Sequence, residues 1–506
     1  MPQPMYDYDI VIIGSGLGGL VCGAILSKNG YRVGIYEKNR QIGGCLQTYS
    51  RDKTIIDTGV HYIGGLGVGQ QLHQVFKYLG ITEQLKLKQL DIDGFDYIGF
   101  ADDDNTYKLA QGYDNFIAQL LKDFPGEKEA LNKYCDKIKE VCAKFPMYNL
   151  RTGDNSEKED VLHIDTSAFL ASITGNKKLQ QVLAGNNLLY AGVADKTPLY
   201  IHALITNSFI ESAWKCVDGG SQIAKLLAKR ITENGGAIHR NCEVKQIVGE
   251  GEKAGHIILK NGKKVTATYF ISNLHPAQTI KITDSNVLRN AYRWRINSLN
   301  NTIGTFLLNI VLKKDTFPYL NYNYYHHETE DAWKGVDYTH ENWPLTYALF
   351  VNASSKHEQF ADSLTIMTYM RYEDVAKWED TFNTDSQPED RGADYETFKK
   401  EKAERLLDVV AKKFPDIREC IKSYYVATPL SYRDYQGSSD GSMYGIEKDY
   451  RNSVKTLIPP KTRLPNLFLT GQNLNVHGVL GVTISALMTC GELVDMERLL
   501  NDINAA

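Results

Sequence analysis

A short apolar run, a glycine-rich turn and a longer apolar stretch follow one another near the start of the chain. Residues 10–13 are all aliphatic, apolar positions recur at helical spacing over 20–25, and residues 32–36 form a second β-like run that ends at Glu37. This succession predicts a strand, a helix and a second strand joined by short loops.

The first half of the chain then becomes helical in character. Residues 70–150 carry apolar residues at helical spacing with lysines and acids between them, and similar patterns return over 168–189 and 197–214. We expect a mostly helical insertion here. Cys135 and Cys142 lie seven residues apart and would share one helix face, where we interpret them as small core residues.

Short strands dominate the region that follows. An amphipathic helix is predicted over 222–234, with β-like runs at 243–248 and 256–260. Residues 261–262 are Asn-Gly, a pair typical of hairpin turns. A second insertion over about 286–454 is richer in strand-like runs than the first.

The end of the chain resembles its beginning. A buried strand is predicted to end at Gly471, a glycine-bearing loop covers 472–481, and an apolar helix follows from residue 482 to about 499. A helix that begins after such a loop presents free N–H groups to an anion. Beside a flavin ring, its positive end would stabilise the anionic reduced form.

Length and composition narrow the classes of protein that fit this pattern. The chain has 506 residues, more than one ordinary core supports, so two domains are expected. Its formal net charge of −4 argues against a nucleic-acid partner and against electrostatic docking on anionic lipid. The eight cysteines show no metal-binding spacing and no export signal is evident, so we expect reduced thiols in a cytoplasmic protein without a bound metal.

The first turn has the spacing G-x-G-x-x-G, which is typical of dinucleotide binding. Gly14 would make the tight turn, Gly16 would let the backbone approach a pyrophosphate, and Gly19 would let the helix lie close to the strand. Glu37 could accept a hydrogen bond from an adenosine ribose hydroxyl. The alternatives are a glycine-rich turn without a ligand and a membrane span, and acidic flanks and crowded glycines disfavour the span.

A second glycine loop follows at once. Gly43 and Gly44, three residues after Arg40, would let the backbone pass close to a ligand that is longer than NAD, such as a flavin dinucleotide. The next stretch, 57–65, contains His61. A surface turn with an incidental histidine is the alternative interpretation of that stretch.

Together these segments resemble the FAD-dependent carotenoid oxidoreductases, which include phytoene desaturases, carotenoid isomerases and retinol saturases. The matching stretches are GSGLGGL with Glu37, RQIGGCLQT, DTGVHYIGG, GGSQIA, ATPLSYRDYQGSSDGSMYG and LTGQNLNVHGVLG. DTGVHYIGG and LTGQ are most similar to the retinol saturase branch. The resemblance implies an α/β protein with a Rossmann-like FAD-binding domain (GR2-type flavoprotein) built from discontinuous segments, and a mixed α+β substrate domain built from two insertions. The implied boundaries are 1–70, 215–285 and 455–506 for the FAD-binding domain, and 71–214 and 286–454 for the substrate domain.

The resemblance also implies which residues hold the cofactor. They are Gly14, Ser15, Gly16, Gly18, Gly19, Glu37, Lys38, Arg40, Gly43, Gly44, Val244, Gly471, Gln472, Gly478, Gly481 and Val482. Many relatives of this fold have an acid at the position of Gln472, so a hydrogen bond from this chain would be neutral there. No catalytic residue is assigned. His61 is a candidate for relaying a proton, and packing against the flavin without titrating is the alternative.

By the same resemblance, the protein is an FAD-dependent oxidoreductase that saturates or desaturates a C–C bond in an apolar isoprenoid or polyene by hydride transfer at flavin N5. NAD(P)H stays open as the reductant. An amine-oxidase-like flavoenzyme and a non-redox FAD-dependent isomerase are the alternatives. Because no other run of about twenty apolar residues is present, contact with a membrane would be peripheral. We expect an exposed apolar patch for that contact on the helical insertion.

Overall fold

The computed structural model describes residues 6–506, so the first five residues of the expected FAD-binding domain lie outside the described part. A mainly parallel sheet has the order β10-β2-β1-β13-β12-β11-β14, with β20 also paired to β13. Its strands are β1 (Tyr8–Ile13), β2 (Val33–Tyr36), β10 (Ala237–His239), β11 (Val244–Glu250), β12 (Lys253–Leu259), β13 (Lys264–Ser272), β14 (Thr283–Asp284) and β20 (Leu467–Leu469). Three distant regions of the chain therefore meet in one sheet.

The apolar run at the start of the chain forms the strand that the sequence predicts, and the strand is covered on both sides. Ile10 and Ile12 pack into one hydrophobic cluster, while Val11 and Ile13 pack into another on the opposite face. A strand buried on both faces has no polar alternation, which explains the continuous apolar run. The helices beside this sheet are α1 (Leu17–Lys28), α8 (Ser221–Glu233), α9 (Pro276–Ile282), α10 (Asn290–Asn297), α15 (Gly478–Cys490) and α16 (Met496–Asn504).

A second sheet has the order β19-β15-β18-β17-β16-β7-β8. Its strands are β7 (Asp96–Phe100), β8 (Asp103–Leu109), β15 (Gly304–Leu312), β16 (Asn323–His327), β17 (Thr346–Val351), β18 (Ser363–Met370) and β19 (Ile421–Ala427). β7 and β8 come from the first insertion, and β7 pairs in parallel with β16 of the second. The helical pattern of the first insertion did not predict these strands. The two insertions share one sheet.

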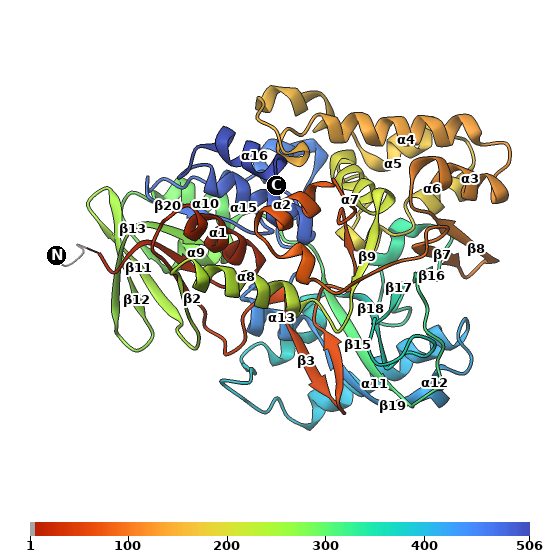
Figure 1. Cartoon of the computed structure of the whole chain (residues 1–506). Helices are drawn as coiled ribbons and strands as arrows, with labels where there is room; N and C mark the ends of the chain where they lie inside the picture. Colours follow the sequence, from red (N-terminus) through yellow and green to blue (C-terminus); the bar gives the residue numbers. More distant parts are fainter. Residues whose placement is uncertain (1–5) are drawn as a thin grey trace.

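The first insertion also carries the predicted helices. They are α2 (Gln71–Tyr78), α3 (Tyr113–Asp123), α4 (Lys128–Ala143), α5 (Thr166–Ile173), α6 (Lys177–Leu183) and α7 (Leu199–Glu211). Cys135 and Cys142 are both buried on α4, as expected for core residues. α7 is buried at every position from Leu199 to Ile210, because α4, η5, β5 and β9 pack around it. Figure 1 shows α3–α6 far from the N-terminus, on the side of the second sheet.

Shorter elements complete the chain. They are β3 (Thr48–Arg51), β4 (Thr54–Asp57), β5 (Ile63–Gly64), β6 (Leu87–Gln89), β9 (Ala213–Cys216), α11 (Ala393–Ala411), α12 (Ile417–Cys420), α13 (Pro429–Gln436), α14 (Ser453–Thr456), η1 (Gly44–Leu46), η2 (Thr82–Gln84), η3 (Met147–Asn149), η4 (Asn155–Val161), η5 (Asn187–Tyr190), η6 (Ala332–Val336), η7 (Tyr372–Trp378) and η8 (Tyr450–Asn452). Over residues 6–506, every helix is too short or too polar to cross a bilayer.

Candidate functional site

A cavity of about 1110 Å³ joins the glycine loops of the first sheet to the second sheet and the helical insertion. Its polar part is lined by the β1–α1 loop, η1, the start of β11 and the start of α15. Its other part is lined mainly by apolar and aromatic side chains, which include Ile63, Phe145, Met147, Tyr148, Leu189, Tyr200, Leu204, Phe209, Phe350, Met367, Leu480 and Ile484. One continuous space therefore touches both a phosphate-type cradle and an apolar channel.

The glycines of the β1–α1 turn lie where a side chain would collide with neighbouring atoms. A Cβ atom on Gly16 would lie 2.7 Å from Nδ2 of Asn273, and one on Gly18 would lie 2.6 Å from Oδ1 of the same residue. A Cβ on Gly19 would collide with the carbonyl oxygen of Gly14, so this helix can lie close to its strand only with glycine there. No side chain caps the N-terminus of α1, so its first N–H groups remain available to a ligand.

Glu37 is hydrogen-bonded to this loop. Its Oε2 accepts hydrogen bonds from the backbone N–H of Ser15 at 2.9 Å and from the Ser15 hydroxyl at 2.7 Å, and its Oε1 accepts one from the N–H of Asn39 at 2.8 Å. The side chain is only 6% exposed and lines the cavity. It lies at the end of β2, where an acid can reach the ribose of a bound dinucleotide.

The second glycine loop touches the first. The N–H of Gly43 donates to the carbonyl of Ser15 at 2.9 Å, and a Cβ on Gly44 would lie 3.2 Å from the Cα of Gly16. Both Gly43 and Gly44 have positive φ angles, +112° and +56°, which favour glycine. Arg40 is exposed and does not line the cavity. The two loops together form one narrow backbone cradle.

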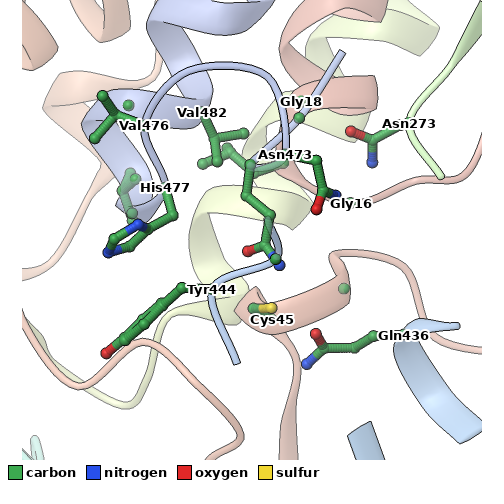
Figure 2. A pocket seen from close by; sticks show the side chains of 18 of the residues that line it. Gly16, Gly18, Cys45, Asn273, Gln436, Tyr444, Asn473, Val476, His477 and Val482 are labelled. Carbon is green, nitrogen blue, oxygen red and sulfur yellow. The ribbon is translucent and has the colours of Figure 1, made fainter. Parts of the chain in front are cut away.

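The C-terminal segment supplies the opposite wall, which Figure 2 shows close to Gly16 and Asn273. α15 begins at Gly478, its N-terminus has no side-chain cap, and Val482 lines the cavity one turn later. A Cβ on Gly481 would lie 2.6 Å from the carbonyl oxygen of Val476. Gly471 and Gln472 also line the wall, as do Lys38 and Val244 nearer Glu37.

His61 lies in the wall between the polar and apolar parts. Its ring stacks on Phe350 with the centroids 4.6 Å apart and the planes 7° from parallel. Both ring nitrogens are buried and have no hydrogen-bond partner within the described residues. Burial, with a further contribution from the charge of Lys215, lowers the pKa of His61 to about 4. The imidazole is therefore neutral at physiological pH.

A buried polar network lies behind the next residue, Tyr62. The Tyr62 hydroxyl donates to Asp96 at 2.9 Å and contacts the Tyr325 hydroxyl at 2.7 Å. Asp96 also accepts from Asn323 at 3.0 Å and Asn186 at 3.2 Å. Burial raises the pKa of Asp96 to about 6 despite these donors, so the carboxyl takes up a proton at a higher pH than an ordinary aspartate.

Several wall residues were not predicted from the sequence. Asn273 faces both Gly16 and Gly18, and its only sequence signal is its place directly after the buried strand β13. Residues 435–439 reach the polar wall from the second insertion, and Gln436 lies near Cys45 in Figure 2. The ring of Tyr444 stacks on His477 with centroids 4.1 Å apart. No spacing along the chain signals these last contacts.

Comparison with known proteins first defines the class. Residues 12–79 match the family model "NAD(P)-binding Rossmann-like domain". A structure titled as a mutant of putrescine oxidase superimposes with a TM-score of 0.62 at 14% identity, covering 98% of this chain and 99% of that one. The protein is thus an α/β protein with a Rossmann-like dinucleotide-binding domain, as the sequence predicts.

Similarity along the whole chain is then more specific. All-trans-retinol 13,14-reductase of Danio rerio is 26% identical over 541 residues, which cover 96% of this chain and 86% of that protein. Chloroplastic prolycopene isomerase of Daucus carota is 24% identical, with 95% of this chain and 79% of that protein covered. The resemblance to FAD-dependent carotenoid oxidoreductases, and to the retinol saturase branch, is confirmed.

Proposed function

We propose that this protein is an FAD-dependent oxidoreductase that saturates or desaturates a C–C bond in an apolar isoprenoid or polyene. The observation that carries the proposal is the single cavity that touches both the glycine cradle and an apolar channel. Relatives named as a retinol reductase and a 4,4'-diapophytoene desaturase support the type of bond and substrate. A bound flavin would supply hydride transfer at N5, which neither protein side chains nor water can provide.

The wall residues fit FAD. Two uncapped helix N-termini, those of α1 and α15, open onto one cavity and suit a pyrophosphate and an electron-rich ring respectively. Gly16 and Gly18 leave backbone surface free where a side chain would collide with Asn273. Both nitrogens of His61 are buried without a partner, so a polar atom of a bound ligand would relieve an unfavourable burial. We propose fifteen of the sixteen residues assigned from the resemblance as the binding set, leaving out the exposed Arg40 and adding Asn273.

The chain's own residues would orient the substrate and exclude water. Phe350, Phe209 and Leu480 confine an extended apolar chain between the second sheet and α15. Water exclusion strengthens the electrostatic interactions of every wall dipole. His61 is neutral and therefore does not serve as a cationic proton donor. Asp96, which accepts a hydrogen bond from Tyr62 and has a raised pKa, is the better candidate for holding a proton.

We also propose the two-domain division given by the sequence, with residues 71–214 and 286–454 forming the substrate domain. The shared sheet of β7, β16 and their neighbours supports this division, because strands from both insertions are hydrogen-bonded together. NAD(P)H as reductant and peripheral contact with a membrane surface, from a cytoplasmic location, belong to the same proposal.

The alternatives predict different electron balances. For a saturase, anaerobic photoreduction of the FAD-loaded protein, followed by addition of all-trans-retinol or a carotene, should reoxidise the flavin in proportion to a product two mass units heavier. For a desaturase, the oxidised flavin should instead become reduced in proportion to a product two mass units lighter. A product of unchanged mass and altered double-bond geometry, with flavin that stays reduced, would assign an isomerase, which the prolycopene isomerase relatives make the second candidate. Turnover of a water-soluble amine with oxygen, and none of a polyene, would reject the proposal in favour of an amine oxidase.

A further inference from the structure

The apolar part of the cavity reaches the surface beside η3 and η4. Phe145, Met147 and Lys158 line it there, and so do residues 152–154, which are exposed. α15 passes along the wall from Gly478, near the glycine cradle, to Met488. α15 also contacts η3 beside the mouth, and ten residues of α-helix span about 15 Å, so the mouth lies roughly that far from the start of α15.

Lys158 is a cation without a counter-ion at this mouth. The side chain is half-buried, and its ammonium lies 5.9 Å from the centre of the Phe145 ring. Burial lowers the pKa of Lys158, and no neighbouring acid offsets that effect. Among the side chains that the structure describes, none forms an ion pair or a hydrogen bond with this ammonium. A half-buried charge without a partner is unfavourable unless a ligand supplies one.

Four acids, on η4, at its N-cap or in the cavity wall, are already engaged elsewhere. Glu157 binds Arg151 at 2.6 Å, Asp160 binds Lys144 at 3.1 Å, and Glu492 binds Lys461 at 2.6 Å, while Asp154 caps η4 by accepting from the N–H of Ser156 at 2.9 Å. Lys158 therefore pairs with none of these four acids. The residues around this charge at the mouth include the apolar Phe145 and Met147 and the exposed carboxylate of Asp154.

A second unsatisfied group lies against the same aromatic ring. Tyr200 is fully buried, lines the cavity and stacks on Phe145 with the ring centroids 5.5 Å apart. Its hydroxyl has no hydrogen-bond partner among the residues that the structure describes. An unpaired buried hydroxyl costs free energy. A polar ligand atom bound near Phe145 would therefore have two possible partners, the Lys158 ammonium and the Tyr200 hydroxyl.

We propose that the substrate is an apolar chain ending in a carboxylate, which Lys158 binds at the mouth while the chain lies along α15 toward the glycine cradle. The inference rests on the proposed function and specifies its substrate class. Such an amphiphile keeps its charge near water and buries its tail. A carboxylate fits better than a phosphate, because Arg151 is occupied by Glu157 and a single ammonium offers no bidentate clamp. The chain must be long enough to span roughly 15 Å.

Binding of a matched pair of probes tests this inference. All-trans-retinoic acid and all-trans-retinol share one tail and differ in the headgroup. Their affinities for the FAD-loaded protein are measured by quenching of tryptophan fluorescence. We expect the acid to bind more tightly than the alcohol. Lys158→Met should lower the affinity for the acid by about tenfold and change the affinity for the alcohol less than twofold. Lys158→Arg should restore the preference, and Lys144→Met serves as the control because that lysine is already paired.

Four outcomes separate the possibilities. Equal affinities for acid and alcohol that Lys158→Met does not change would overturn this inference and leave the proposed function standing. A preference for the acid that depends on Lys158, without turnover of any polyene, would support the headgroup site and reject the proposed reaction. Binding of neither probe would reject both. If Lys158→Met instead reduces only flotation with phosphatidylserine vesicles, the lysine serves a lipid surface and the inference fails.

Discussion

At the scale of single residues, burial decides which side chains titrate. Asp57 is 6% exposed, and its Oδ1 accepts from the backbone N–H of Gly220 at 2.8 Å, just before α8. Burial raises the pKa of Asp57 to about 7, which outweighs the hydrogen bond. His61 is shifted in the opposite direction by the same cause. In each case desolvation favours the neutral form.

The raised pKa of Asp57 makes stability depend on pH. The native state holds a proton that the unfolded state loses near its ordinary pKa of 3.8, so native stability falls as pH rises from about 4 to about 7. Asp57→Asn keeps the acceptor for Gly220 and removes the charge. We expect the variant to match the wild type near pH 4 and to exceed its unfolding free energy by about 1–3 kcal/mol at pH 8.

Urea unfolding at several pH values measures this difference. Asp136→Asn, on the exposed face of α4, is the control and should show no such trend. A stability gain of Asp57→Asn that is equal at pH 4 and pH 8 would contradict the assigned titration.

At the scale of elements, the β1–α1 unit determines the polar end of the site. Replacing Gly16 with valine would place a Cβ atom 2.7 Å from Nδ2 of Asn273. We expect Gly16→Val to lose the flavin absorbance and bind FAD at least about a hundredfold more weakly, because the side chain also occupies the phosphate approach. Absorbance after purification and FAD titration of the apoprotein check this.

Circular dichroism separates lost binding from lost folding in that experiment. Gly126→Val is the matched control, since a Cβ at Gly126 meets no atom within 4 Å and this residue lies far along the chain from both glycine loops. A fully flavinated Gly16→Val protein would refute the assignment of this loop to the cofactor.

At the scale of the whole molecule, surface chemistry decides how an apolar substrate is reached. The expected apolar patch is not found on helices α2–α7, where the large hydrophobic side chains are not exposed. Trp294 on α10 is 70% exposed and Val454 on α14 is 67% exposed. Arg295, next to Trp294, donates to the carbonyl of Leu457 at 3.5 Å, and Leu457 lines the cavity. An exposed tryptophan is well suited to a lipid interface.

Flotation with liposomes across a salt series tests peripheral contact. With a net charge of −4, attraction to anionic lipid should be weak. Binding should therefore persist at high salt, and Trp294→Ser should reduce it several-fold, because apolar burial is little screened. Val68→Ser, at a 92% exposed position, is the control. Binding that disappears at high salt would show that charge carries the contact instead.

Much of the first sheet and its loops could be predicted from the sequence. Continuous apolar runs predict buried strands, and the positions of Gly14, Gly16 and Gly19 predict the β1–α1 turn, since local backbone geometry restricts which residues fit there. β7 was missed because its pairing with β16 joins residues more than two hundred positions apart, and β8, which pairs with β7, was missed with it. Asn273 and Tyr444 were missed because their roles depend on neighbours from other segments.

The sequence by itself determined the class of fold, the glycine cradle and the family resemblance, because these depend on short-range spacing. Only the tertiary structure decided that the cradle and an apolar channel share one cavity, that His61 is buried without a partner, and that Lys158 is left without a counter-ion. The physical reason is desolvation. The state and pairing of a charge depend on everything packed around it, and packing brings together segments that the chain order keeps far apart.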